Sequence, residues 1–207
     1  MRQPVRITSG RRVAVALVAL LLARLPLALA GQPGTRTPGL REAAAASQLA
    51  LRSPDVAPGG TIALGHIYDQ SGCHGGNTSP ALSWNHAPAS TRSFAVLMFD
   101  PDAGGGGWWH WAVFDIPATV SSLRAGAGAP AGRLLPAGAI QARNDFGSQG
   151  YAGPCPPPGP PHHYRLMLYA LRVTKLGLDA GTNAAQVAAR AQANALAEAE
   201  IVGLYGR

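Results

Sequence analysis

The stretch DPDAGGGGWWHW, residues 100–111, contains residue types that could form a chemically active site. Asp100 and Asp102 flank a proline, four glycines follow, and His110 lies between tryptophans. An aspartate and a histidine that meet at one place can bind an anion, share a proton or hold a metal ion. Aspartate and glycine are also common in ordinary turns, so the position of this stretch in the fold must decide between these interpretations.

Two predicted strands bring Asp100 and His110 together. The apolar run SFAVLMFD, 93–100, is typical of a buried strand, and HWAVFDIP predicts a second strand over 110–116. If these strands are antiparallel neighbours, Asp100 ends one and His110 begins the other at the same end of the sheet. Alternation along the second strand predicts one face made of His110, Ala112, Phe114 and Ile116.

A third predicted strand, 163–173, begins beside His162 and Tyr164 and directly follows the proline-rich run GPCPPPGPP. These two side chains join the same rim if this strand runs in the right direction, which the sequence leaves open. His162 and His163 are adjacent, so alternation directs them to opposite faces and at most one faces the rim.

The remaining elements predict a mostly β, α+β fold. TIALGHIY, 61–68, suggests an early strand. The alanine-rich run from Asn183 to Gly206 favours one or two helices packed on the sheet, and Asn183 followed by Gln186 resembles a capping box. Helices appended after a series of strands favour this class over alternating strands and helices.

The N-terminus has the three-part pattern of a secretory signal peptide over 1–30, with arginines, an apolar run at 13–23 and a small-residue cleavage site before Gly31. An uncleaved anchor is the alternative. Residues 31–48 resemble a linker, and the globular domain is predicted over 49–207. The predicted location is therefore periplasmic or secreted, with no stable membrane span once the signal is removed.

Removal of the signal changes the charge balance. The full chain has 17 basic and 10 acidic residues, and residues 1–30 contain five arginines and no acid, which leaves a net charge of +2. The sequence therefore gives little support for nucleic-acid binding. Cys73 and Cys155 lie in glycine- and proline-rich stretches, and the sequence allows either a disulfide or two separate thiols.

Four motifs together resemble the phosphatidylethanolamine-binding protein (PEBP) family, and in particular its bacterial Raf-kinase-inhibitor-like branch. They are SPALSW, DPDAGGGGWWHW, RNDFGSQGYAGPCPPPGPPHHY and LAEAEIVGLYGR. The resemblance covers residues 49–207 and implies a large central β-sheet packed against a smaller sheet, with C-terminal helices. It also implies a rim pocket for phosphate or a phosphorylated head group, formed here by Asp100, His110, His162, Tyr164 and Trp108, with Asp102 bracing the loop.

The resemblance implies a non-catalytic protein that binds a small anion such as phosphate or phosphoethanolamine. Such a protein could also inhibit a cell-envelope enzyme such as a protease. The alternative is a hydrolase in which Asp100, His110 and His162 hold a metal or act as acid and base. No cofactor is predicted, and no metal ligand is assigned. Protonated imidazoles donate to anions, so binding is predicted to strengthen as the pH falls toward 6.

Overall fold

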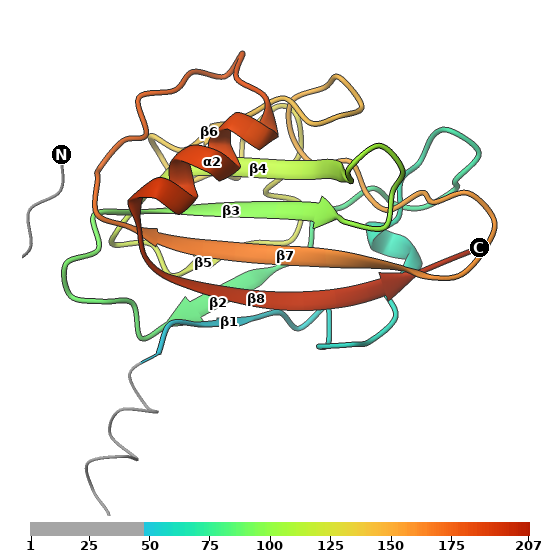
Figure 1. The fold of residues 1–207 in the computed structure, drawn as a ribbon, viewed down its shortest axis with the longest axis horizontal. Coiled ribbons are helices and arrows are strands. Elements are labelled where there is room, and N and C mark those ends of the chain that lie inside the picture. The colour runs from blue at the N-terminus through green and yellow to red at the C-terminus, as the bar shows by residue number, and fades with distance from the viewer. Residues whose placement is uncertain (1–47) are drawn as a thin grey trace, which may run out of the picture. The chain divides into compact units, whose positions relative to one another are not determined.

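The structure, a computed structural model, describes residues 48–207. The predicted signal peptide and nearly all of the predicted linker lie outside these residues. The described part contains two β-sheets and one α-helix (Figure 1). In chain order, the elements are β1 (Ala50–Arg52), the 3-10 helix η1 (Leu64–His66), β2 (Leu82–Asn85), β3 (Ser93–Asp100), β4 (Trp108–Pro117), β5 (Ser122–Leu123), β6 (Ile140–Gln141), β7 (His162–Leu171), α2 (Ala184–Asn194) and β8 (Ala195–Tyr205).

The larger sheet has the order β6-β4-β3-β7-β8 and the smaller one the order β1-β2-β5, with every strand pair antiparallel. β3 lies at the centre of the larger sheet, as its apolar sequence predicts. Phe94, Val96 and Met98 pack on the side of the smaller sheet, whereas Ala95 and Leu97 pack on the side of α2. The mostly β class with two packed sheets is therefore confirmed.

Helix α2 begins where the capping box predicts. The Asn183 side-chain oxygen accepts a hydrogen bond from the Gln186 amide at 2.9 Å, and three small apolar side chains face the sheet: Ala184, Val187 and Ala191. The prediction of helix over 195–205 is wrong, because this segment forms β8 along the edge of β7. The alternation of alanine and glutamate in ALAEAE suits a strand with one exposed face, and pairing with β7 outweighs the helix propensity of these residues.

The predicted strand over 61–68 is also wrong. This segment makes one isolated bridge, Thr61 to Leu204, and then turns into η1. The Ile62 amide donates to the Leu204 carbonyl of β8, but the following backbone groups bond to a glycine-rich loop, since the Gly65 carbonyl accepts from Thr78 and the Ile67 carbonyl accepts from Asn77. A short apolar run can thus be buried without belonging to a sheet.

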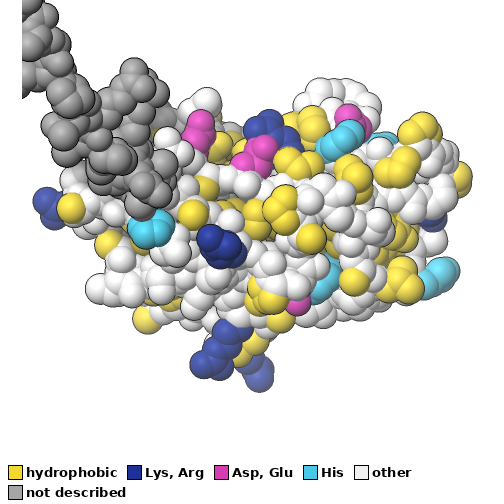
Figure 2. Space-filling view, turned by 90° about the horizontal axis from the view of Figure 1, so that it is seen from below, with side chains coloured by type: hydrophobic (Ala, Val, Ile, Leu, Met, Phe, Trp, Pro, Cys, Tyr) yellow, Lys and Arg dark blue, Asp and Glu magenta, His cyan; other side chains and the backbone are white. Residues whose placement is uncertain are grey.

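Within residues 48–207, no helix is long and apolar enough to cross a membrane. Figure 2 shows one face of the molecule, on which arginine and lysine side chains occur at separate places among neutral and acidic ones. That face therefore offers no continuous basic stripe for a nucleic-acid backbone to follow.

Candidate functional site

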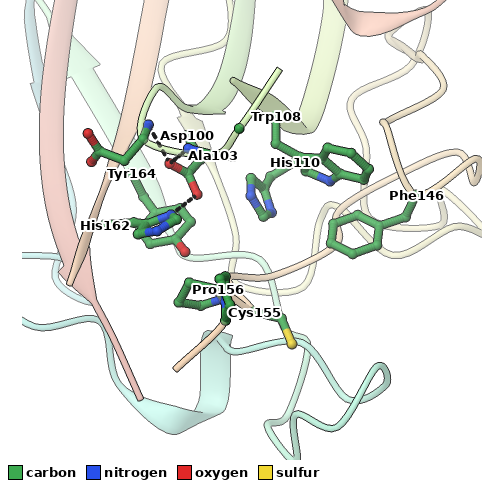
Figure 3. Close-up of a pocket in the computed structure, with 12 residues that line it drawn as sticks. Asp100, Ala103, Trp108, His110, Phe146, Cys155, Pro156, His162 and Tyr164 are labelled. Carbon is green, nitrogen blue, oxygen red and sulfur yellow. Dashed lines mark hydrogen bonds and ion pairs between the residues drawn. The ribbon is translucent and has the colours of Figure 1, made fainter. Parts of the chain in front are cut away.

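A cavity of about 330 Å³ lies at the end of the larger sheet where β3 ends and β4 and β7 begin (Figure 3). All five residues predicted to form a ligand pocket line it. The lining consists of Asp100, Asp102, Ala103, Gly104, Trp108, His110, Phe146, Cys155, Pro156, Pro157, His162 and Tyr164. The direction of β7, which the sequence leaves open, is antiparallel to β3, so His162 and Tyr164 reach the same rim as Asp100.

A β-bulge at His110 turns its ring into this cavity. Phe99 pairs with Trp109 and Met98 pairs with Trp111, so His110 is an extra residue on β4. A bulge of this kind re-aims a side chain at the end of a strand. The His110 ring consequently lies 5.3 Å, centroid to centroid, from the ring of Tyr164, while Trp111 enters the core on the same side of the sheet.

The prediction that His110, Ala112, Phe114 and Ile116 share one face is therefore wrong. Ala112 and Phe114 pack on the α2 side, whereas Ile116 packs on the side of the smaller sheet. A second register shift separates Phe114 from Ile116, and Asp115 there has a φ of 56°. Strict alternation fails because each extra residue reverses the face of those that follow.

His110 is held in one orientation by two backbone carbonyls. Its side chain is buried, and Nδ1 lies 2.7 Å from the oxygen of Ala152 and 3.1 Å from that of Gly153. Both partners are acceptors, so Nδ1 carries a hydrogen. Nε2 is then an acceptor in the neutral ring and a donor only in the protonated ring. Burial lowers the pKa of His110, against the opposing effects of the Ala152 hydrogen bond and the Asp100 charge.

The Asp100 carboxylate holds the following loop and His162 at the same time. Oδ1 accepts from the amides of Asp102 and Ala103 at 2.9 and 3.1 Å, and Oδ2 lies 2.7 Å from Nδ1 of His162. As with His110, this leaves Nε2 as the ring nitrogen of His162 without a partner among residues 48–207. Asp100 therefore orients a neighbouring ring in addition to lining the cavity.

Asp102 forms a second, exposed clasp beside the first. Its Oδ2 accepts from the amide of His163 at 2.7 Å and lies 2.8 Å from the Nδ1 of the same residue. These hydrogen bonds, led by the one from the amide, lower the pKa of Asp102. Asp102 thus joins the loop to the start of β7, and His162, unlike His163, lines the cavity.

Two further donors belong to side chains that line the cavity: the Trp108 indole N–H, which is buried without a protein partner among residues 48–207, and the Tyr164 hydroxyl, which lies near Asp100. Burial, together with the nearby Asp100 charge, raises the pKa of Tyr164, so its hydroxyl keeps its proton. Trp108 packs edge-on against Phe146, with ring centroids 5.4 Å apart. A buried donor without a partner is uncommon in folded proteins, so the Trp108 N–H is a candidate contact for a bound molecule.

Sequence reasoning did not assign the opposite side of the cavity, which is formed by Phe146, Cys155, Pro156 and Pro157. A disulfide joins Cys155 to Cys73. The proline-rich run directly before His162 was a usable signal for Cys155 to Pro157, since a segment adjacent to a rim residue is likewise near the rim. Phe146 lies within RNDFGSQGYAGPCPPPGPPHHY, one of the four motifs that carry the family resemblance, so that motif was the available signal for it.

The glycine loop has one position where a side chain cannot fit. A Cβ on Gly107 would overlap the ring of Phe99 and meet the carbonyl oxygen of Asp100 at 2.8 Å, and its φ is 100°. A Cβ on Gly104 would meet nothing within 4 Å. We expect Gly107→Ala to lower the free energy of unfolding by about 2 kcal/mol or more, because it adds both overlap and backbone strain. Urea titration of Gly107→Ala and Gly104→Ala measures the free energy of unfolding of each variant. Equal values for the two variants would contradict this expectation.

These features define a class of protein: a mostly β domain with two packed sheets and, at one rim, a small cavity lined by histidine, aspartate and aromatic side chains. The family model for the phosphatidylethanolamine-binding protein matches residues 52–206, and the chain belongs to this PEBP family.

Two relatives give the extent of the similarity. The UPF0098 protein YbcL of Escherichia coli is 45% identical over 164 residues, which are 78% of this chain and 90% of YbcL. The crystal structure of YbcL, described as a member of the mammalian PEBP family, matches with a TM-score of 0.76 at 44% identity, covering 77% of this chain and 99% of that one. LppC of Mycobacterium tuberculosis, named as a candidate lipoprotein, is 38% identical and covers 79% of this chain and 75% of its own length.

Proposed function

We propose that the chain binds a small phosphate-bearing ligand in the rim cavity without changing it chemically. The observation that carries this proposal is His110, whose ring is fixed through Nδ1 by backbone carbonyls so that Nε2 is the nitrogen left for a ligand. The buried Trp108 indole N–H, which has no protein partner among residues 48–207, supports it, because a phosphate oxygen is an acceptor.

The charges around the cavity favour a zwitterion over a simple anion. None of the twelve lining residues is lysine or arginine, and two are aspartates. Asp100 is engaged through both oxygens, but Asp102 is exposed and uses Oδ2 alone for His163. An ammonium group at Asp102 Oδ1 would balance that charge while the phosphate faces His110. We therefore expect phosphoethanolamine to bind more tightly than inorganic phosphate in calorimetric titration. No heat of binding from either ligand, with folded protein, would overturn the proposal.

Binding should depend on pH with a definite sign. Burial lowers the pKa of free His110, so near neutral pH its Nε2 is an acceptor, whereas a phosphate oxygen requires a donor. The complex then contains one more proton than the free partners. Affinity should rise as the pH falls from 8 to 6.5, by at most about tenfold per pH unit.

A phosphate monoester loses its second charge near pH about 6, which ends this rise. Glycerophosphoethanolamine, a diester, lacks that ionisation, so its affinity should continue to rise below pH 6. Calorimetry with both ligands over this range makes the comparison. An affinity that increases with pH would contradict proton uptake at His110.

Acid–base hydrolysis is the alternative, and the 2.7 Å contact between Asp100 and His162 Nδ1 is the observation in its favour. A carboxylate bound to Nδ1 orients an imidazole for proton transfer through Nε2. Within residues 48–207, no three His, Cys, Asp or Glu side chains are grouped to hold a metal ion. Release of product from phosphoethanolamine during overnight incubation, or stoichiometric zinc or iron that is lost in His110→Ala, would favour the enzyme.

We also propose that the chain acts outside the cytoplasm, in the periplasm or as a secreted protein. A disulfide between Cys73 and Cys155 supports this, since disulfides persist in oxidising compartments. The name of the relative LppC is consistent with an envelope location. Cell fractionation followed by N-terminal sequencing would test it, with a mature chain that begins at Gly31 as the expected result. Inhibition of an envelope enzyme such as a protease stays a proposal that rests on the family resemblance.

A further inference from the structure

One side of the cavity is a lip made of Cys155, Pro156 and Pro157. After Cys155, the lip has no backbone N–H that could donate a hydrogen bond, because Pro156 and Pro157 are prolines. The chain just before it is fixed, since the Pro154 carbonyl accepts from Tyr68 at 3.1 Å and the Gly153 amide donates to Asn77 at 2.9 Å. Apart from packing, the bonds that can hold the lip are therefore the disulfide at the Cys155 sulfur and hydrogen bonds to the proline carbonyls.

Two separate closures do this, and both tie the lip to the loop at residues 72–73. The first is the disulfide from Cys155 to Cys73. The second is the Arg207 side chain, whose Nε donates to the Pro156 carbonyl at 2.6 Å and whose Nη1 donates to the Gly72 carbonyl at 2.9 Å. Arg207 links Pro156 to Gly72, and the disulfide links Cys155 to Cys73, which are their chain neighbours. Either closure can therefore keep the lip in place when the other is lost.

We propose that the cavity is under thiol control: the Cys73–Cys155 disulfide and Arg207 together hold the lip over the ligand, and a dithiol reductant loosens it, with Arg207 as the positioning residue that limits the loss. This inference rests on the proposed phosphate-ligand function. Arg207 does not line the cavity and acts through the lip alone.

The exposure of the two sulfurs determines where reduction begins. Cys73 is only 4% exposed, whereas Cys155 is half-buried and lines the cavity. A thiolate of the dithiol attacks Cys155 Sγ, which breaks the disulfide, forms a mixed disulfide and releases the Cys73 thiolate. The second thiolate of the dithiol then displaces the Cys155 thiolate. Two electrons pass from the dithiol to the protein, the dithiol becomes a disulfide, and each released thiolate takes up a proton.

Ligand and disulfide should protect each other. Because Cys155 lines the cavity, a bound ligand contacts the lip and favours its closed position, in which the disulfide is intact. Thermodynamic coupling between ligand binding and disulfide formation is reciprocal. If the disulfide strengthens ligand binding, the ligand must stabilise the disulfide to the same extent. Saturating phosphoethanolamine should therefore slow reduction by dithiothreitol.

The test compares the affinity for phosphoethanolamine of four forms of the full chain by calorimetry. These are the oxidised protein, Cys73→Ala/Cys155→Ala, Arg207→Ala and the combined triple variant. We expect about threefold weaker binding when either closure is removed and at least about thirtyfold weaker binding when both are removed, a loss larger than the product of the separate losses. Arg190→Ala, an exposed arginine on α2, is the matched control and should bind like the unchanged protein.

The outcomes separate this inference from the proposed function. If the oxidised protein does not bind the ligand, the proposed function fails. If all four forms bind equally, or the separate losses simply multiply, the redundant closure is wrong although the function stands. Thermal unfolding shows which variants are folded at the assay temperature. The rate of dithiothreitol reduction with and without phosphoethanolamine requires no variant, and equal rates would also overturn thiol control.

Discussion

Replacement of His110 by asparagine is expected to weaken phosphoethanolamine binding by about 10- to 100-fold, the value of one hydrogen bond to a charged group. The asparagine amide can donate to the Ala152 carbonyl in place of Nδ1, which in His110 lies 2.7 Å from that oxygen. It has no counterpart of Nε2. The substitution therefore removes the ligand-facing nitrogen while it keeps the buried carbonyl satisfied, and calorimetry measures the loss.

His163→Asn is the matched control for this experiment. It makes the same change on β7, in an exposed ring that is clasped to Asp102 and does not line the cavity. Its affinity should be nearly unchanged. If His110→Asn, shown to be folded by its thermal transition, binds as tightly as the unchanged protein, then His110 is a structural residue and the ligand, if any, contacts other groups.

Loss of the disulfide should have the largest effect on stability. Cys73 and Cys155 are 82 residues apart, and opening a loop of that length costs about 4 kcal/mol of unfolding free energy on the chain-entropy model. Alanine at both positions avoids placing a hydroxyl in the buried site of Cys73. Urea unfolding of Cys73→Ala/Cys155→Ala should show this decrease, with a melting temperature roughly 10 °C lower.

A single Cys155→Ala variant provides the comparison. It breaks the same bridge, so it should lose nearly the same stability as the double variant. If the single and the double variant each lose less than about 1 kcal/mol of unfolding free energy, the unfolded chain gains little freedom when the disulfide is removed. A loss in the double variant alone would point to packing at Cys73 as the cause.

The centre of the fold was predictable because its strands are long and strongly patterned. β3 is apolar between Ser93 and Asp100, and β7 has a continuous buried run over 166–171 that follows the polar start at His162. Since antiparallel neighbours bring such ends together, chain order was enough to suggest one rim. The direction of β7 was not available from the sequence, because it depends on which strand it pairs with.

What could not be predicted depends on contacts between distant segments. Residues 195–205 prefer a helix locally, yet the open edge of β7 makes them a strand. The bulge at His110 and the reversal at Asp115 arise from the register between β3 and β4, which no single strand encodes. The lip residues Cys155 and Pro156 reach the cavity through a disulfide partner and an arginine that lie far away in the chain.

The cavity is assembled from segments that are widely separated in the sequence, since Asp100 contacts a residue 62 positions away and Arg207 contacts one 135 positions away. Contacts of such long range are slow to form during folding. A partly folded chain that lacks β7 has no complete cavity, because His162 and Tyr164 belong to that strand, so ligand binding reports on completed folding. A ligand that binds the folded chain alone also shifts the folding equilibrium, by about 2.7 kcal/mol at a hundred times its dissociation constant.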